Sequence, residues 1–339
     1  MPLTRRDRVS LALTTSVALL TLAACGDGAP RQSESSGTTL RLALNQTEEH
    51  PSFVALDNFG QRLSESTDGR WNIDVYPNAT LGAQQEVLQL VGDGVVEMAI
   101  VSGTQLENVE EDFRVFNMPQ VFDSVEHQMD VIHDPAIVGE LYSSLEDQNV
   151  TVLGGFTQGT RSIYTSDGPV RTPEDLDGQK IRVQESELHI SMMERMGGAA
   201  TPMAYGEVYT ALQSGVLDGA ENNEVSYVSA QHFEVAPYFS NTNHLVGVDY
   251  LVISTDRLDA MSEQDRAAFE QEWTAAHEEH TELWAEATEQ AIADAKAGGA
   301  QFNDVDTEAF RSALEPMADE ALTTDTQREL YEATRAGAD

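Results

Sequence analysis

Cysteine is almost absent from this chain of 339 residues, because Cys25 is the only one. No intrachain disulfide can form, and the sequence after Cys25 has no thiol nucleophile. Other catalytic signatures are also missing, since the chain has no GxSxG turn, no glycine-rich phosphate loop and no HExxH helix. These absences argue against an enzyme, and we expect no catalytic residues.

Basic residues are scarce as well. The chain has 19 lysines and arginines against 58 aspartates and glutamates, which gives a net charge of −39. Only Lys180 and Lys296 are lysines. Such a surface repels nucleic acid and anionic membranes, so neither is an expected partner. The balance is typical of a protein from a salty habitat, and an ordinarily acidic exported protein is the alternative.

The N-terminus has the features of an export signal. Arg5, Arg6 and Arg8 precede an apolar run over residues 9–22, which is too short for an ordinary membrane span. Leu22-Ala23-Ala24-Cys25 resembles a bacterial lipobox. We therefore expect a lipoprotein signal peptide over 1–24, a membrane-anchoring lipid on Cys25 and a flexible tether over 25–37. A free thiol behind an ordinary signal peptide is the alternative, and export by the twin-arginine or the general route stays open.

The first half of the chain alternates between strand and helix patterns. Its apolar and alternating runs predict strands at 40–44, 71–76, 97–101 and 150–155. Helices are expected from Pro51 to the turn at Asp68-Gly69, over 83–91, and near 124–133 and 135–147. The β-α-β-α-β order is typical of a largely parallel sheet with ligand loops at the carboxyl ends of its strands.

The stretch from Arg161 to His244 organises the second half. Lys180-Ile181-Arg182-Val183-Gln184 has the period-two pattern of a short strand. Thr172 and Asp175 upstream fit a capping box around one helical turn. Helices are expected over 186–196 and over 205–214, and residues 249–254 are expected to form another apolar strand. An arginine at a strand end, facing polar loops, is typical of a ligand site in an open α/β sheet.

A long helix is expected near the C-terminus. Residues 262–297 contain no proline or glycine, and such a helix would span about 50 Å, more than one domain. One apolar face steps by three or four residues through Phe269, Trp273, Ala276, His280, Trp284, Ala287 and Ala291. His277 and His280 have a possible metal-ligand spacing, but we interpret them as surface or packing residues and expect no metal site.

An ordered set of short motifs resembles the DctP-like solute-binding subunits of TRAP transporters. The motifs run through residues 38–320 and include Gly159-Thr160-Arg161, Pro173-Glu174-Asp175-Leu176, Lys180-Ile181-Arg182-Val183, Ala200-Thr201-Pro202-Met203, Asp218-Gly219 and Glu221-Asn222. The resemblance implies a two-domain, periplasmic-binding-protein-like α/β fold with a cleft, hinge strands and a bracing helix. We expect domain I over 38–158, completed by about 248–287, and domain II over 159–247, completed by about 288–339.

The resemblance also implies ligand-binding residues. Arg182 would bind a ligand carboxylate, because a guanidinium presents a planar fork that matches it. Arg161 would be the second ligand arginine, and Asn222 would bind the same carboxylate or a neighbouring hydroxyl, with a helix N-cap as its alternative role. Tyr205 would form a wall of the pocket, unless it is a core aromatic.

Other candidates follow from topology alone. Strand-end loops of the first domain offer Glu48, Glu49, His50, Ser102 and Gln105. Glu185 and Glu221 adjoin the arginine motifs, where they could accept hydroxyl hydrogen bonds or brace the arginines. His244 is expected to be structural.

The predicted function is capture of an organic acid by hinge closure and its delivery to TRAP permease subunits, without a cofactor. The acidic loops favour a sugar acid such as a hexuronate over a four-carbon dicarboxylate, because a glutamate repels a second ligand carboxylate. The alternatives are a binder of four-carbon dicarboxylates for the same kind of transporter, a ligand-sensing subunit for a receptor, and an enzyme acting on a sugar acid.

Overall fold

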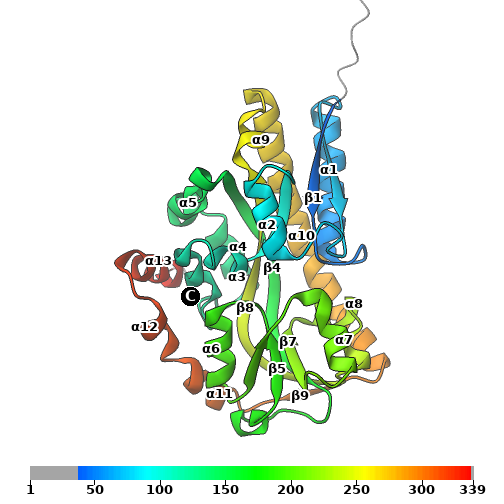
Figure 1. Ribbon diagram of the computed structural model, residues 1–339, viewed down its shortest axis with the longest axis vertical. Coiled ribbons are helices and arrows are strands. Elements are labelled where there is room, and N and C mark those ends of the chain that lie inside the picture. The colour runs from blue at the N-terminus through cyan, green and yellow to red at the C-terminus, as the bar shows by residue number, and fades with distance from the viewer. Residues whose placement is uncertain (1–36, 337–339) are drawn as a thin grey trace, which may run out of the picture. The chain divides into compact units, whose positions relative to one another are not determined.

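The computed structural model describes residues 37–336 and places nine strands in one mixed sheet (Figure 1). The strands follow the order β2-β1-β3-β8-β4-β7-β5-β6, and β9 pairs with β8. Their bounds are β1 Thr38–Ala43, β2 Trp71–Tyr76, β3 Met98–Ser102, β4 Val150–Thr165, β5 Lys180–Val183, β6 Ala199–Pro202, β7 Gly219–Asn222, β8 Tyr238–Ser254 and β9 Gln301–Asp304.

Thirteen α-helices lie within the described residues and make the protein an α/β fold. They are α1 Pro51–Ser66, α2 Gln84–Gly92, α3 Gly103–Glu107, α4 Val125–Ile132, α5 Pro135–Ser143, α6 Glu187–Arg195, α7 Val208–Gln213, α8 Glu224–Ser229, α9 Thr255–Asp259, α10 Glu263–Ala297, α11 Thr307–Leu314, α12 Met317–Ala321 and α13 Asp325–Ala336. In the part of the chain that is described, no helix is long and apolar enough to cross a membrane.

The sheet is parallel in its outer parts and antiparallel in its middle. Strand β1 pairs in parallel with β2 and β3, as the strand-helix alternation predicts. Strand β5 likewise pairs in parallel with β6 and β7. Between these groups, β8 runs antiparallel to β3 and β4, and β4 runs antiparallel to β7. The parallel strands therefore end near the middle of the molecule, where their loops can meet.

Strands β4 and β8 are much longer than the sequence pattern predicts, with 16 and 17 residues. The expected strands covered only 150–155 and 249–254. Two glycines within β4 made the sequence pattern look as if the strand ended early. Gly154 and Gly159 adopt positive φ angles of 118° and 62°, which are not ordinary strand values. The pairing register shifts at three places along the two strands. Such bulges interrupt a period-two pattern without ending the strand.

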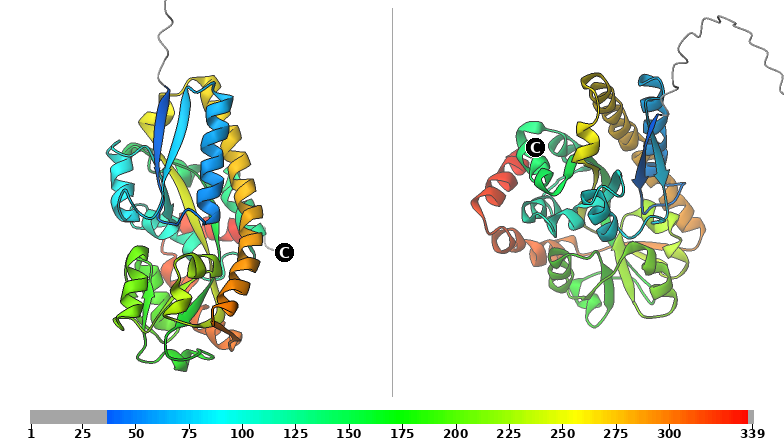
Figure 2. Two further views of the ribbon diagram at one scale, coloured as in Figure 1. Left: turned by 90° about the vertical axis from the view of Figure 1, so that its right-hand side faces the viewer. Right: turned by 45° about the horizontal axis from the view of Figure 1, so that its top comes forward.

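Helix α10 covers 35 residues and confirms the predicted long helix. The Ser262 side chain caps it by accepting a hydrogen bond from the Asp265 amide. Phe269, Trp273 and Ala276 pack in a core cluster with α1 and β1–β3, whereas Ala295 packs in a different cluster with β7 and β8. Figure 2 shows α10 running beside α1 and onward past the loops below it. One helix thus joins two separate cores.

Local capping explains several other helix boundaries. Thr172 and Asp175 form the predicted capping box around the 3₁₀ turn Pro173–Leu176. Ser186 caps α6, and Asn223, not Asn222, caps α8. The segment that begins at Tyr205 divides into a 3₁₀ turn, Tyr205–Glu207, and the short helix α7.

The C-terminal tail ends in a helix that packs on elements from the first half of the chain. The expectation placed 288–339 with domain II. Helix α13 instead packs against residues 111–143, because the Thr334 carbonyl lies 2.9 Å from His127 Nε2 and Arg335 lies 2.5 Å from the Asp123 carboxylate. These contacts bring the end of the tail beside residues that were expected in domain I.

Candidate functional site

Loops at the carboxyl ends of the parallel strands surround a cavity of about 430 Å³. Asn45 and Gln46 follow β1, Ser102 ends β3, and Gln184 and Asn222 mark the ends of β5 and β7. Gln158 and Arg161 enter from β4, Asp249 from β8 and Trp284 from α10. This placement agrees with the rule that open α/β sheets bind ligands at the carboxyl ends of their strands.

Arg161 is completely paired inside the protein. Its Nε and Nη2 donate to the two carboxylate oxygens of Glu221 at 2.6 and 2.7 Å, and Nη2 also donates to the Glu221 carbonyl at 3.0 Å. Its Nη1 donates to Gln158 Oε1 at 2.7 Å and to Asn222 Oδ1 at 2.8 Å. A guanidinium has five N–H donors, so this one has none left for a ligand unless a bond is exchanged.

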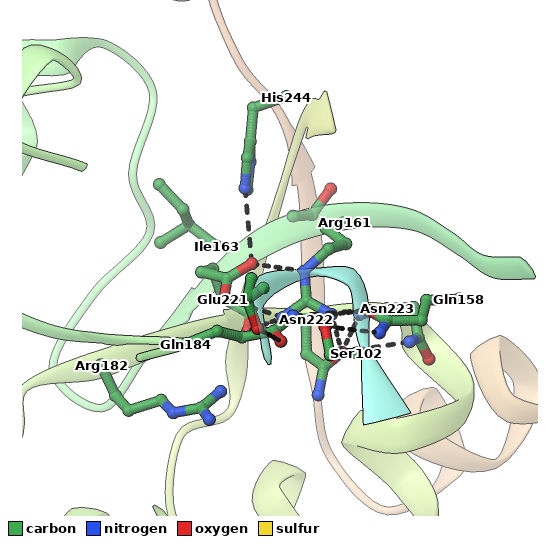
Figure 3. A network of polar contacts seen from close by, with 12 residues as sticks. Ser102, Gln158, Arg161, Ile163, Arg182, Gln184, Glu221, Asn222, Asn223 and His244 are labelled. Atoms are coloured by element: carbon green, nitrogen blue, oxygen red, sulfur yellow. Dashed lines mark hydrogen bonds and ion pairs between the residues drawn. The ribbon is translucent and has the colours of Figure 1, made fainter. Parts of the chain in front are cut away.

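The Arg161–Glu221 ion pair is buried, and its two charges neutralise each other. Both side chains are almost completely inaccessible, at 2% and 0% exposed. Burial raises the pKa of the Glu221 carboxyl, but the adjoining Arg161 guanidinium overcomes this effect and holds the pKa well below its usual range. His244 Nε2 lies 3.6 Å from the same carboxylate. Of the two roles considered for Glu221, the structure shows bracing of an arginine (Figure 3).

Arg182 is buried to a similar degree but is not neutralised. It is 4% exposed, and its Nε and Nη2 donate to the Met203 carbonyl at 2.8 and 2.6 Å. No carboxylate within residues 37–336 lies at ion-pair distance from it. Burial lowers the pKa of the guanidinium, which the Glu221 charge only partly offsets. Figure 3 shows Arg182 standing apart from the Arg161 network.

Asn222 presents amide donors to the cavity. Its Oδ1 accepts hydrogen bonds from Arg161, from the Asn223 backbone amide at 2.9 Å and from Asn223 Nδ2 at 3.0 Å. This set of three donors fixes the orientation of the amide, so Nδ2 is the atom left over. Asn222 lines the cavity, so that NH₂ group is available to a ligand oxygen.

The remaining predicted residues divide into those that line the cavity and two, Glu48 and Glu49, that do not. Tyr205, Ser102, Gln105 and Glu185 are in the cavity wall. Tyr205 donates from its hydroxyl to the Ser226 carbonyl at 3.0 Å, which fixes its ring there. Glu49 is exposed and outside the lining. Its loop contributes Asn45, Gln46 and His50 instead, because His50 turns inward to cap α1 through Nδ1.

Sequence reasoning missed several residues of the wall. Gln158 lies in the part of β4 that the strand prediction did not reach, and Asp249 was assigned only to an apolar strand. Trp284 was predicted for the apolar face of α10, yet it also borders the cavity. Its approach depends on Gly159, since a Cβ there would lie 2.6 Å from Trp284 Nε1.

Three contacts join the two sides of the cavity. Thr104 Oγ1 donates to Gln184 Oε1 at 3.0 Å, and Asn108 Nδ2 donates to the Glu185 carbonyl at 2.8 Å. Ser186 Oγ donates to the buried Glu107 carboxylate. These bonds link α3 and the residue after it to the loop after β5.

The two helical histidines are packing residues. His277 stacks on His133 at 3.7 Å between ring centroids, and His280 stacks on Phe156 at 4.0 Å. Among residues 37–336, no group of three or more potential side-chain ligands could hold a metal ion. The predicted lipidation site, Cys25, lies outside the described residues.

A cavity with one unneutralised buried cation and many amide groups is the site of a protein that binds a small polar anion. Comparison with known proteins specifies the class. Residues 42–325 match bacterial extracellular solute-binding protein family 7, the DctP family, and the chain belongs to it. The resemblance drawn from the motifs is thereby confirmed, as is the fold class.

Individual relatives agree with this assignment. A solute-binding protein of Chromohalobacter salexigens is 38% identical over 291 residues, which cover 82% of this chain and 85% of the relative. A TRAP periplasmic solute-binding protein of Anaerococcus prevotii with bound glucuronate superposes with a TM-score of 0.86 at 34% identity, covering 88% of this chain and 98% of that one. One from Xanthobacter autotrophicus with bound galacturonate gives 0.84 at 29% identity, covering 88% and 99%.

Proposed function

We propose that this protein captures a hexuronate outside the cytoplasm and delivers it to a TRAP permease. The observation that carries the proposal is Arg182, a buried guanidinium beside the cavity with no carboxylate partner among the described residues. A buried charge without a partner is costly, and a ligand carboxylate is the group that would compensate it. The uronates bound by the two structural relatives support this ligand class.

Arg182 and Asn222 form the carboxylate-binding end of the site. Arg182 supplies charge and free N–H groups, and Asn222 supplies Nδ2. Arg161 contributes indirectly to ligand binding, because its hydrogen bonds orient the side chains of Asn222 and Gln158. It thus positions the site while remaining paired with Glu221.

The rest of the cavity suits hydroxyl groups. Asn45 Oδ1, Gln46 Oε1 and His50 Nε2 are buried and have no hydrogen-bond partner in the described structure. The two amide oxygens can accept from sugar hydroxyls, whereas His50 Nε2 carries the ring proton and can donate to a hydroxyl oxygen, because Nδ1 accepts from the Ser52 amide. The Trp284 and Tyr205 rings supply flat surface beside these groups. The volume of about 430 Å³ lies within the range of about 300–1,000 Å³ that is usual for small-molecule sites.

Capture would occur by closure of two domains around β4 and β8. Both strands run between the first parallel group and the second, so bending at their register shifts would move one group against the other. The contacts from Thr104, Glu107 and Asn108 to residues 184–186 would then belong to the closed form. We assign domain I to 38–158 and domain II to 159–247, with α13 joining the former.

The anchoring and the partners follow from the same role. The Leu22-Ala23-Ala24-Cys25 motif supports a lipid on Cys25, with residues 25–37 as the tether to the membrane. The closed form would dock on the permease subunits. The family and its structural relatives bind solutes for transporters, and we extend this to an absence of catalysis.

Titration calorimetry of the mature protein tests the ligand class. Glucuronate and galacturonate should bind with a 1:1 stoichiometry, whereas succinate and malate should bind far more weakly. Tight succinate binding with no response to any uronate would replace the hexuronate by a four-carbon dicarboxylate. Chemical change of a bound uronate during long incubation would show an enzyme instead.

A further inference from the structure

We propose that Asp249 is a ligand-binding residue that accepts a hydrogen bond from a hydroxyl of the captured sugar acid and excludes acids carrying a second carboxylate. The inference rests on the proposed function and specifies which side chain sets its selectivity. It starts from a carboxylate whose hydrogen bonding the protein leaves incomplete.

Asp249 is placed in the wall of the cavity by the pairing of β8. It stands opposite Ser102, the last residue of β3, and opposite Phe156 of β4. Its side chain lines the cavity although the residue is only 4% exposed. A central strand thus carries a carboxylate into a site otherwise lined largely by amides, hydroxyls and arginines.

The protein satisfies only one oxygen of this carboxylate. Gln158 Nε2 donates to Oδ1 at 2.6 Å, and no donor within residues 37–336 bonds to Oδ2. Gln158 has no further N–H to offer, since the same Nε2 also lies 3.2 Å from Ser102 Oγ and 3.2 Å from the Val248 carbonyl. No arginine, lysine or histidine of the described chain lies at ion-pair distance. The second oxygen is therefore free to accept a hydrogen bond from a ligand in the cavity.

The electrostatics of the site determine which donor fits. Glu221 already neutralises Arg161, so the charges left over beside the cavity include Arg182 and Asp249. A ligand that places its carboxylate on Arg182 must offer Asp249 a neutral or positive group. Sugar hydroxyls are neutral donors of the right kind, whereas a second carboxylate would face Asp249 in a desolvated site and be repelled. Hexuronates meet both requirements and the corresponding aldarates do not.

Titration of Asp249 gives a second consequence. Burial raises the pKa of Asp249 to about 6, against a hydrogen bond from Gln158 and the Arg161 charge that lower it. The ionised form accepts from the ligand, so hexuronate affinity should be highest above pH 6 and should fall as pH falls through 6 toward 5. Gln158 bonds to Asp249, Ser102 and Phe156 stand opposite it on the neighbouring strands, and the Arg161 charge acts on it. The wider wall adds the titratable groups Arg182, Tyr205, His50, Glu185 and Glu207.

The experiment compares wild type with Asp249→Asn by calorimetry, using glucuronate and galacturonate against glucarate and galactarate. Asn keeps an acceptor for Gln158 but turns an NH₂ toward the ligand. We expect a loss of about ten- to a hundred-fold for the hexuronates, the scale of one charge-assisted hydrogen bond. The aldarates should lose less or gain, so that the preference for the hexuronate shrinks. Asp74→Asn, on the exposed side of β2, makes the same charge change and should leave both affinities unaltered.

Each outcome decides. An equal loss for all four ligands would make Asp249 a brace for Gln158 and overturn the proposal, as would unchanged affinities. If Asp249→Asn does not fold, wild-type affinity measured from pH 5 to pH 8 decides, because a flat profile contradicts a ligand-binding carboxylate. Tighter binding of a 2-amino sugar acid than of any hexuronate would show that Asp249 binds a ligand ammonium group. That result would overturn the proposed hydrogen bond from a hydroxyl. A wild type that binds no hexuronate overturns the proposed function as well.

Discussion

The two arginines beside the cavity are buried almost equally, yet the protein treats them in opposite ways. Arg161 is 2% exposed and gives every N–H to protein acceptors, including both oxygens of Glu221. Arg182 is 4% exposed and bonds only to the Met203 carbonyl. The first charge is neutralised within the fold, and we propose that the second pairs with the ligand. Burial alone therefore does not distinguish the two arginines, whereas the presence or absence of a counter-ion does.

The largest expected effect comes from removing one charge of the buried Arg161–Glu221 ion pair. Glu221→Gln should lower the free energy of unfolding by about 3–5 kcal/mol, because Arg161 would remain buried without its counter-charge. Chemical denaturation at neutral pH measures the change.

Glu308→Gln is the matched control for this variant. It removes the partner of Arg311 in an exposed pair whose side chains are 69% and 58% accessible. The cost there should stay below about 0.5 kcal/mol. Similar losses in the two variants would mean that the buried pair is not the stabilising contact that its geometry indicates.

Arg182→Ala should do the opposite of Glu221→Gln, because it should weaken ligand binding without lowering the stability of the fold. Binding of a hexuronate should weaken by about 2–5 kcal/mol, since the ligand carboxylate loses its charged partner. The free energy of unfolding should hold or rise, because a buried charge without a counter-ion has been removed. Calorimetry and denaturation on the same preparation measure both quantities.

Arg182→Lys sharpens this test, because it keeps the charge and loses the planar fork. It should also bind poorly. Arg328→Ala, in an exposed pair on α13, is the control and should leave both quantities unchanged. Near-normal affinity in Arg182→Ala would remove Arg182 from the binding site.

Sequence motifs located Arg182, Arg161 and Asn222, and local patterns located most helices and the parallel strands. They could not show that Glu221 closes around Arg161, since that pair joins β4 to β7 across 60 residues. The sequence patterns also failed to indicate Gln158 and Asp249 as cavity residues. Both lie on long strands whose glycines and bulges break the period-two pattern. Glu49 illustrates the remaining failure, because topology places a loop at the cavity but not the side chain that turns inward.

The smallest expected effect concerns salt, and it separates the local charge of Arg182 from the field of the whole protein. The chain carries a net charge of −39, which repels an anionic ligand at long range. Added salt screens that repulsion over a distance of about 8–10 Å near physiological ionic strength, but it reaches a desolvated ion pair much less. Association rates for glucuronate should therefore hold steady or rise modestly between low and high ionic strength. Stopped-flow measurements following tryptophan fluorescence can report them, since Trp284 borders the cavity. A steep fall with salt would instead show that a long-range positive field steers the ligand, and Arg182 would then not act alone in attracting it.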